Sequence, residues 1–247
     1  MLDPAAPQLV VNARVLQFSW LPADPDAVAA FLPTGLRPRE DRQVFLCQYV
    51  VDDESQTSGF GAYSLTYLGI SLVGADPPDG DTPGGWWSHY FASSPRVREY
   101  AAARGVPAGA GQTTVDVRGE QLTAETRADG RPIIRTVALV GHTGHLVRSG
   151  HHRYLTGRDG ELTSADYPYV AEPVTPFEIE SVEFLAPDHP VYPLRPANPL
   201  TIGWGFYSPR VSFAYPAGPH AFDRPPTAVP AHQVPARRAR SGLPSGS

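Results

Sequence analysis

A histidine in the aromatic segment WWSHYFA, directly before a predicted helix, is the first candidate for acid–base chemistry. This residue is His89, and a histidine side chain, whose unperturbed pKa is near neutral, can act as a general acid or base. Strand alternation places Trp87 and His89 on one face and Ser88 and Tyr90 on the other, and nothing in the sequence says which face points inward. His89 is therefore predicted to be either catalytic or structural.

Three further polar side chains lie in apolar segments. Tyr63 begins the segment YSLTYLGISLV, and its hydroxyl group can donate or accept a hydrogen bond. Arg135, within IIRTVALV, is either the buried partner of a carboxylate or enolate, or a residue on the open face of a strand. Cys47, within QVFLCQYVV, is a nucleophile only if its pKa is lowered, and so apolar a segment favours an inert small side chain.

The sequence predicts no metal and no organic cofactor. His142 and His145, followed by His151 and His152, invite a metal, but glycines at 141 and 144 argue against a helix there, and no cysteine or acidic ligand lies close by. There is no glycine-rich phosphate loop and no Gly-x-Ser-x-Gly or Cys-x-x-Cys motif. All 20 residues counted as Lys or Arg are arginines, so no lysine can form a Schiff base.

Composition excludes several classes of partner. The net charge of −5 and the pI of about 5.9 indicate no basic surface for nucleic acid or for an anionic membrane. No apolar run is long enough to cross a bilayer, the N-terminus lacks the pattern of a signal peptide, and Cys47 is the only cysteine. We therefore predict a cytoplasmic protein whose partner is a small-molecule substrate.

The 28 prolines and 23 glycines favour short strands joined by turns. Strands are predicted at 10–20, 43–51, 62–73, 86–91, 113–118, 121–127, 133–140, 145–155, 177–185, 200–207 and 211–215. Asp24 is expected to cap a short helix and Ser94 a longer one. The bare segment 105–111 is predicted to be a loop that either allows close approach of the backbone or leaves a hole where larger side chains might sit. Residues 216–247 are predicted to be a proline-rich flexible tail.

The order of these segments resembles the acetoacetate decarboxylase superfamily. The resemblance is carried by DPDAVAAFLPTGL, TSGFGAYS, the Ser-Pro-helix-Val-Pro run ending at Pro107, the ADGR hairpin and SPRVSFAY, and it covers Asn12 to Tyr215. It implies a mostly β (α+β) fold, a cone-shaped and largely antiparallel β-barrel with an internal pocket and two short helices, and a homo-oligomeric assembly. We expect this domain at residues 1–215 and the tail at 216–247.

The lysine that the family's chemistry needs is missing. In the family a Schiff-base lysine, usually followed by a second lysine, comes directly after the proline that matches Pro107. The charge of the second lysine lowers the pKa of the first and makes it nucleophilic. Here the two positions hold Ala108 and Gly109, which cannot form an imine.

The other site residues of the family are missing as well. Its two acidic residues fall near Cys47 or Gln48 and at Leu65, and its arginine falls at Ala13. Smaller and less polar side chains predict an enlarged, more apolar cavity, unless the aromatic residues on the surrounding strands simply fill the barrel. The predicted substrate-binding residues are Trp87, Tyr90, Cys47, Gln48, Leu65, Ala108 and Gly109, and the predicted catalytic residues are His89, Tyr63 and Arg135.

Different classes of function remain open. The favoured one is a cofactor-independent enzyme of specialised, polyketide-like metabolism that shapes a bulky, largely apolar substrate for cyclisation, isomerisation or dehydration. The alternative is a non-catalytic small-molecule-binding protein on the same fold. A third reading, a lysine-independent decarboxylase, needs a buried cation, for which Arg135 is the candidate. An inward-facing histidine and arginine would favour catalysis, and an all-apolar lining would favour binding.

Overall fold

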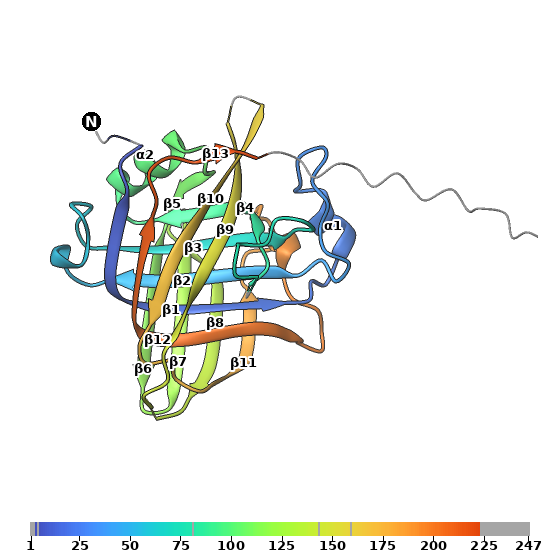
Figure 1. Ribbon diagram of the computed structural model, residues 1–247. Coiled ribbons are helices and arrows are strands. Elements are labelled where there is room, and N and C mark those ends of the chain that lie inside the picture. The colour runs from blue at the N-terminus through green and yellow to red at the C-terminus, as the bar shows by residue number, and fades with distance from the viewer. Residues whose placement is uncertain (1–2, 4, 81, 143, 159, 223–247) are drawn as a thin grey trace, which may run out of the picture.

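Seven strands close into a barrel (Figure 1). The computed structural model describes residues 3, 5–80, 82–142, 144–158 and 160–222. The order around the barrel is β12 (Ile202–Tyr215), β1 (Gln8–Trp20), β2 (Val44–Val51), β3 (Tyr63–Ser71), β4 (Gly85–Ala92), β9 (Arg148–Arg158) and β10 (Glu161–Ala171), and β10 pairs with β12 to close the ring. Of these pairs β4 and β9 run parallel and the others antiparallel. The predicted mostly β fold, with a barrel and two short helices, is confirmed.

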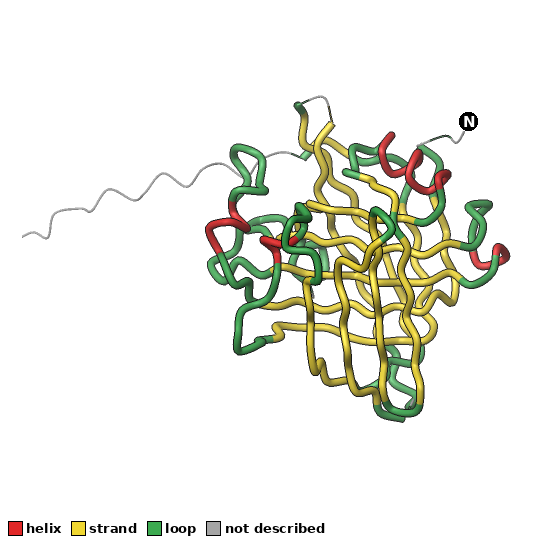
Figure 2. Tube along the Cα trace, turned by 180° about the vertical axis from the view of Figure 1, so that it is seen from behind, coloured by secondary structure: helices red, strands yellow, loops and turns green. Residues whose placement is uncertain are grey.

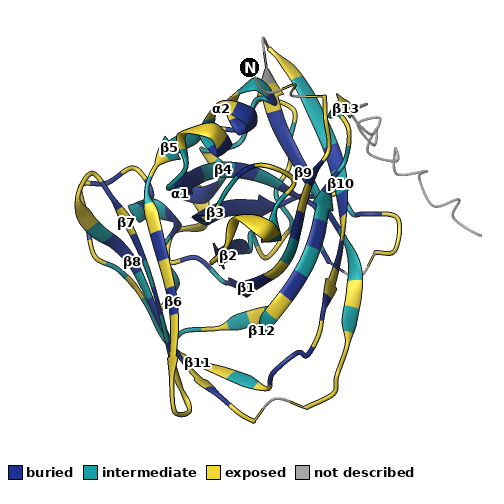
Figure 3. Ribbon diagram, turned by 90° about the vertical axis from the view of Figure 1, so that its left-hand side faces the viewer, coloured by how far each residue is buried: buried dark blue, intermediate teal, exposed yellow. Residues whose placement is uncertain are grey.

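A four-stranded sheet packs against the outside of the barrel. Its order is β11 (Phe177–Phe184), β8 (Arg131–Val140), β7 (Gln121–Ala128) and β6 (Gln112–Arg118). One face of this sheet and the outer face of the barrel enclose a core of mainly aliphatic side chains, such as Leu46, Leu122 and Ile134, which we call the outer core. Figure 3 shows the consequence for burial: β2 and β3 are buried along almost their whole length, whereas β7 alternates between buried and less buried residues.

Both predicted helix caps are confirmed. The side chain of Asp24 accepts hydrogen bonds from backbone N–H groups at the start of α1 (Pro25–Ala29). Ser94 does the same for α2 (Pro95–Ala103), and Gly105, with a φ of 79°, follows the end of that helix. Figure 2 shows that the helical segments, including short 3₁₀ turns at Glu54–Gln56 and Tyr192–Leu194, lie at the periphery of the strands.

Three segments differ from the prediction. Residues 161–171, to which the sequence analysis assigned no element, form β10. The strands predicted at 200–207 and 211–215 are one strand, β12, because both halves pair with β1. The predicted loop 105–111 contains β5 (Ala108–Ala110), which pairs in parallel with β4. The expected close approach occurs at Gly111, where a Cβ atom would lie 2.8 Å from the Cβ of Phe91.

Part of the predicted tail lies against the barrel. β13 (His220–Ala221) pairs with β10, and the N–H of Phe222 donates to the carbonyl oxygen of Leu162 at 2.9 Å. Residues 223–247, the rest of that tail, lie outside the described residues. In the part of the chain that the structure describes, no helix combines the length and apolar character needed to cross a membrane.

Candidate ligand site inside the barrel

Aromatic rings fill the interior of the barrel. Trp87 stacks on Tyr154 with ring centroids 4.0 Å apart and on Tyr67 with centroids 4.6 Å apart. We call this buried cluster the inner core; its other rings include Tyr49, Tyr63, Tyr90, Tyr167, Tyr169, Phe213 and Tyr215. The prediction of an enlarged cavity is therefore wrong, because these rings occupy the space that smaller side chains at the family's site positions would otherwise leave.

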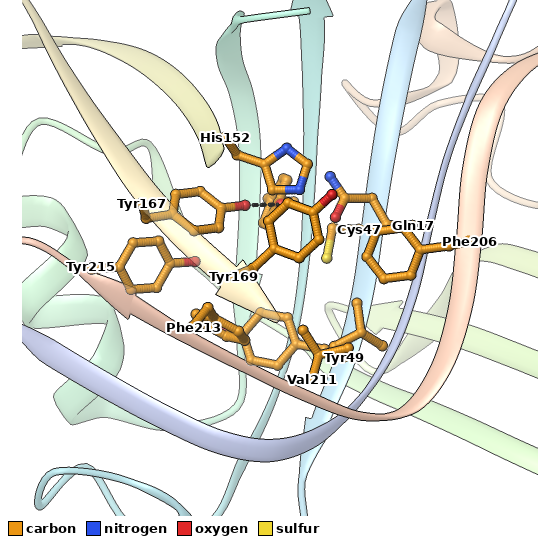
Figure 4. A pocket seen from close by; sticks show the side chains of 12 residues that line it. Gln17, Cys47, Tyr49, His152, Tyr167, Tyr169, Phe206, Val211, Phe213 and Tyr215 are labelled. Atoms are coloured by element: carbon orange, nitrogen blue, oxygen red, sulfur yellow. Dashed lines mark hydrogen bonds between the residues drawn. The ribbon is translucent and has the colours of Figure 1, made fainter. Parts of the chain in front are cut away.

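A small cavity remains among the rings next to His152 (Figure 4). It is bounded by side chains of β1, β2, β3, β9, β10 and β12, and Gln17, Cys47 and His152 are directed into it. The space open to the centre of a water molecule is about 10 Å³, which is room for about one water. In this conformation the cavity accepts a group of a few atoms and excludes a bulky molecule.

The imidazole of His152 presents a bare nitrogen to this cavity. Nδ1 lies 3.2 Å from Thr82 Oγ1, and the same hydroxyl donates to the carbonyl oxygen of His151 at 3.0 Å. Because a hydroxyl has one proton, Nδ1 must be the donor to Thr82, which leaves Nε2 with its lone pair. Nε2 has no hydrogen-bond partner among the described residues. Burial, helped by the charge of Arg148, lowers the pKa of His152 to about 3, so the ring is neutral at physiological pH.

The two polar neighbours of this imidazole differ in what they offer a ligand. Burial raises the pKa of the Cys47 thiol to about 12, so the thiol stays protonated and is not a nucleophile at neutral pH. Gln17, on β1, is 3% exposed, and its amide makes no hydrogen bond to another described residue. The amide of Gln17 is therefore available to a ligand as a donor and an acceptor.

Four tyrosine hydroxyls of the inner core are paired with one another. The hydroxyl oxygens of Tyr67 and Tyr167 lie 2.6 Å apart, and those of Tyr49 and Tyr63 lie 3.0 Å apart. Gln8 donates to the hydroxyl of Tyr63 at 2.8 Å. Burial raises the pKa of all four tyrosines, so they are neutral. Tyr63, a predicted catalytic residue, lies inside the barrel, but its hydroxyl belongs to this structural chain.

A β-bulge in β4 overturns the predicted alternation of that strand. Trp87 pairs with Gly69 and His89 with Leu68, so Ser88 is an extra residue on β4. The extra residue turns the following side chains by one position. Trp87 and Tyr90 therefore both belong to the inner core, and the prediction that Trp87 and His89 share a face is wrong.

His89 lies on the other side of β4, away from the barrel interior. Its ring packs against Phe31, at 5.4 Å between centroids, and against Phe91 at 6.1 Å. Burial, and next the charge of His189, lowers the pKa of His89 to about 4. The structure therefore separates His89 from Tyr63 and from the cavity at His152, and supports the structural alternative for this residue.

Arg135 lies on the open face of β8. Its side chain is 41% exposed and donates from Nη2 to Glu125 Oε2 at 2.9 Å. A second carboxylate, that of Glu183, lies 4.0 Å from Nη1. Of the two alternatives drawn from the sequence, the structure thus has the open-face one, and Arg135 is not a buried partner for a substrate.

Gln48 also lies outside the barrel interior. Side chains alternate along β2, so Cys47 faces inward and Gln48 faces the outer sheet. The amide of Gln48 donates to Thr126 Oγ1 at 2.9 Å and accepts from Thr136 Oγ1 at 3.2 Å. These bonds join the barrel to β7 and β8 and leave Gln48 no direct role inside the barrel.

The remaining predicted residues lie in or beside the inner core. Leu65, Trp87 and Tyr90 are buried members of it, and Ala108 packs against it. Gly109 points elsewhere, since a Cβ atom there would lie 3.8 Å from Cδ1 of Phe91. Most of the predicted binding residues therefore lie together in the barrel, namely Cys47, Leu65, Trp87, Tyr90 and Ala108. Of the predicted catalytic residues, only Tyr63 lies there.

His152 and Gln17 are site residues that were not predicted from the sequence. His152 shares a strand face with Tyr154, two residues further along β9. The direction of this face could not be inferred from the sequence, because β10, which closes the barrel, was not predicted. His151, on the opposite face, binds Asp79 Oδ2 through Nδ1 at 3.0 Å. The two adjacent histidines therefore point apart. The described residues contain no group of three or more histidine, cysteine or acidic side chains arranged to hold a metal ion.

Comparisons with solved structures identify the fold. No protein-family model matches the chain, and no curated protein sequence matches it. An acetoacetate decarboxylase superposes with a TM-score of 0.62 at 17% identity, over 86% of this chain and 88% of that one. Acetoacetate decarboxylase from Legionella pneumophila gives 0.60 at 17% identity, over 90% of each chain. MppR, an enduracididine biosynthesis enzyme in complex with pyruvate, gives 0.63 at 13% identity, over 91% and 93%. The chain thus has the fold of the acetoacetate decarboxylase superfamily.

Proposed function

We propose that the protein is a cofactor-independent enzyme in which His152 removes a proton from a small carbonyl compound bound inside the barrel. The observation that carries this proposal is the buried, neutral imidazole whose unpartnered Nε2 faces the cavity. A neutral imidazole with a free lone pair accepts a proton. Burial disfavours the protonated form of His152. The negative charge that develops on the ligand as the proton leaves therefore has to stabilise the imidazolium.

The dimensions of the cavity favour a compact, planar substrate over the bulky one expected from the sequence. The surrounding rings of Tyr167, Tyr169 and Phe206 suit a flat, largely apolar molecule. The free amide of Gln17 is a donor for its carbonyl oxygen. MppR, a structural neighbour described as an enduracididine biosynthesis enzyme, has been solved with pyruvate, a small carbonyl compound, which supports this substrate class.

The proposed reaction type follows from proton removal next to a carbonyl. An enolate formed in this way can be reprotonated elsewhere, attack within the molecule, or expel a hydroxide, which gives isomerisation, cyclisation or dehydration. None of these needs a lysine imine, and the sequence has no lysine. Cys47 is protonated at neutral pH, so covalent catalysis through its thiolate is not part of the proposal.

Hydrogen–deuterium exchange tests the proposal directly. Wild-type protein is incubated in D₂O with pyruvate, acetoacetate and acetone, and loss of the α-proton signals is followed by NMR. We expect at least one of the three to exchange faster than in buffer, and His152→Gln to lower that rate by roughly 10²-fold or more. His89→Gln is the matched control, because that histidine lies outside the barrel, and it should leave the rate unchanged. Equal rates in wild type and His152→Gln would contradict the assignment.

A second candidate, a non-catalytic binding protein, is favoured by the close ring packing of the inner core. The stacked Trp87 and Tyr154 leave little space for a substrate to change shape. Saturable binding of the three probes, by calorimetry, without any exchange above buffer would support this candidate over the enzyme. A lysine-independent decarboxylase built on Arg135 loses its support, because that side chain is exposed and paired with Glu125.

Assembly and organisation beyond the barrel also belong to this proposal. We expect a cytoplasmic homo-oligomer whose folded domain is followed by a tail within residues 216–247. Light scattering measures the subunit number of the full chain and of a chain ending at Phe222. Equal subunit numbers would show that residues 223–247 do not hold the oligomer together.

A further inference from the structure

A buried arginine without a carboxylate partner lies at the end of α2. Arg104 is 3% exposed, yet no carboxylate of a described residue lies within 4.0 Å of its guanidinium. An isolated charge is costly to bury, and buried arginines are therefore expected to be paired. The carbonyl ends of α2, where Arg104 is the C-cap residue, compensate the charge only in part.

Most of the hydrogen-bonding capacity of this guanidinium is unused. Its Nη1 donates to the hydroxyl of Tyr100, and Nη2 donates to the carbonyl oxygen of Pro216 at 2.7 Å. A guanidinium carries five N–H donors, and the Nε of Arg104 is buried with no partner among the described residues. Both known partners are neutral oxygens, so the position is electropositive and has donors to spare.

A second small cavity lies beside this guanidinium. Its walls include Arg104, Gln8 and the rings of Trp87, Tyr90 and Tyr215, and the space open to the centre of a water molecule is about 10 Å³. It is distinct from the cavity at His152, which shares Tyr215 with it but neither Arg104 nor Trp87. The cavity thus combines a positively charged guanidinium, with several N–H donors in one plane, and flat apolar walls.

We infer that the Arg104 cavity binds a small planar anion, of which a carboxylate group is the best match to the guanidinium. The two oxygens of a carboxylate fit two parallel N–H donors, and the small volume of the cavity restricts the ligand to the shortest acids, such as formate and acetate. The anion site stands on the contacts of Arg104 alone. That the anion is also the substrate rests on the proposed function, and in that case the substrate is a carboxylic acid.

The alternative role for Arg104 is to tie α2 to the segment after β12 through Pro216. A purely structural arginine would change stability when replaced but would give no response to anions. The conservative Arg104→Lys variant keeps the charge and loses the fork, so it should retain part of the anion affinity. If Arg104 acts only as a structural hydrogen-bond donor to Pro216, neither variant should change the affinity for anions.

Matched acid and amide pairs test the inference on the full chain. Formate and acetate are titrated at constant ionic strength against formamide and acetamide, while the Nε–H resonance of Arg104 is followed by NMR and the melting temperature by calorimetry. We expect saturable responses to the acids and an affinity about 10-fold or more above that for the amides. Arg104→Gln should lose that preference, whereas His152→Gln should keep it.

The results distinguish the proposed proton removal by His152 from the proposed anion site at Arg104. Loss of proton exchange in His152→Gln with intact acid binding supports both, and acid binding without any exchange supports the anion site alone. Equal responses to acid and amide, no response at the Arg104 resonance, or an unchanged acid affinity in Arg104→Gln would overturn the anion site. If Arg104→Gln does not fold, the wild-type comparison of acids with amides decides the question by itself.

Discussion

The inner and outer cores of this protein differ in the chemistry of their side chains. The inner core contains nine of the 11 tyrosines, whereas the buried members of the outer core include Tyr207 alone; the nine are Tyr49, Tyr63, Tyr67, Tyr90, Tyr100, Tyr154, Tyr167, Tyr169 and Tyr215. The outer core is mainly aliphatic, and such side chains pack by shape alone. Buried hydroxyls need partners as well as space.

The polar groups of the two regions are satisfied to different degrees. Beside the outer core, both the nitrogen and the oxygen of the Gln48 amide are hydrogen-bonded, to Thr126 and Thr136 respectively. Inside the barrel, His152 Nε2 and Arg104 Nε have no partner among the described residues. The polar groups buried beside the outer sheet are thus satisfied within the protein, whereas the barrel leaves buried polar groups unpaired at a cost in stability.

The largest expected effect comes from removing the central ring of the inner core. Trp87→Ala should lower the free energy of unfolding by about 3–5 kcal/mol and open a cavity between Tyr67 and Tyr154. Leu122→Ala in the outer core is the matched control, with an expected loss of about 2–5 kcal/mol. Urea denaturation followed by circular dichroism measures both.

Binding of indole to the two variants provides a second test of the difference between the cores. It fits the space left by the Trp87 side chain between two flat rings, so 1 mM indole should raise the melting temperature of Trp87→Ala by roughly a few degrees, as expected for a ligand that binds only the folded state. Leu122→Ala should not respond. An equal response in the two variants, or none in either, would show that the inner core collapses like an ordinary apolar core.

The next effect concerns acid. The folded pKa of His152 is about 3, below the value of about 6.5 in an unfolded chain, so between these values the unfolded state binds more protons. The contribution of His152 to stability is therefore present above pH 6.5 and is lost as the pH falls towards 3. Between pH 7 and 4.5 this loss is on the order of 2–3 kcal/mol.

His152→Phe isolates this acid effect, because the carboxylates and His89 titrate in both proteins. Denaturant unfolding at several pH values should show the wild type losing stability faster than His152→Phe as the pH falls. Parallel curves for the two proteins would mean that the imidazole is solvated in the folded state, and the description of a buried, neutral base would be wrong.

The smallest effect is expected outside both cores. Arg135→Gln removes an ion pair with Glu125 on an exposed face, and such pairs contribute about 0.2–1 kcal/mol. Proton exchange and acid binding should be unchanged. A drop in either beyond roughly 10-fold, which corresponds to about 1.4 kcal/mol, would restore Arg135 to the list of functional residues.

Local signals predicted much of the fold. The caps at Asp24 and Ser94, the hairpin between β7 and β8, and the buried strand β2 follow from residue type and spacing within a few positions, and all are present. β10 was missed, and with it the closure of the barrel against β12. That pairing joins segments about 40 residues apart, and no local pattern encodes it.

The candidate site was predictable only in part. The types of residue at the family's site positions follow from the sequence, and so does the absence of a lysine imine. The bulge at Ser88, which turns His89 away from the barrel while Trp87 and Tyr90 stay inside, depends on how β4 meets β3. The same holds for His152, whose inward direction is set by β10.

Residue types and short-range spacing fix which chemistry is impossible and most of the segments that become strands and helices. The tertiary structure alone decided which side chains face the barrel and which of them lack partners. The reason is that a strand has two equivalent faces until its neighbours are in place, and one inserted residue exchanges them. His152 and Arg104 therefore became candidates only when the barrel closed around them.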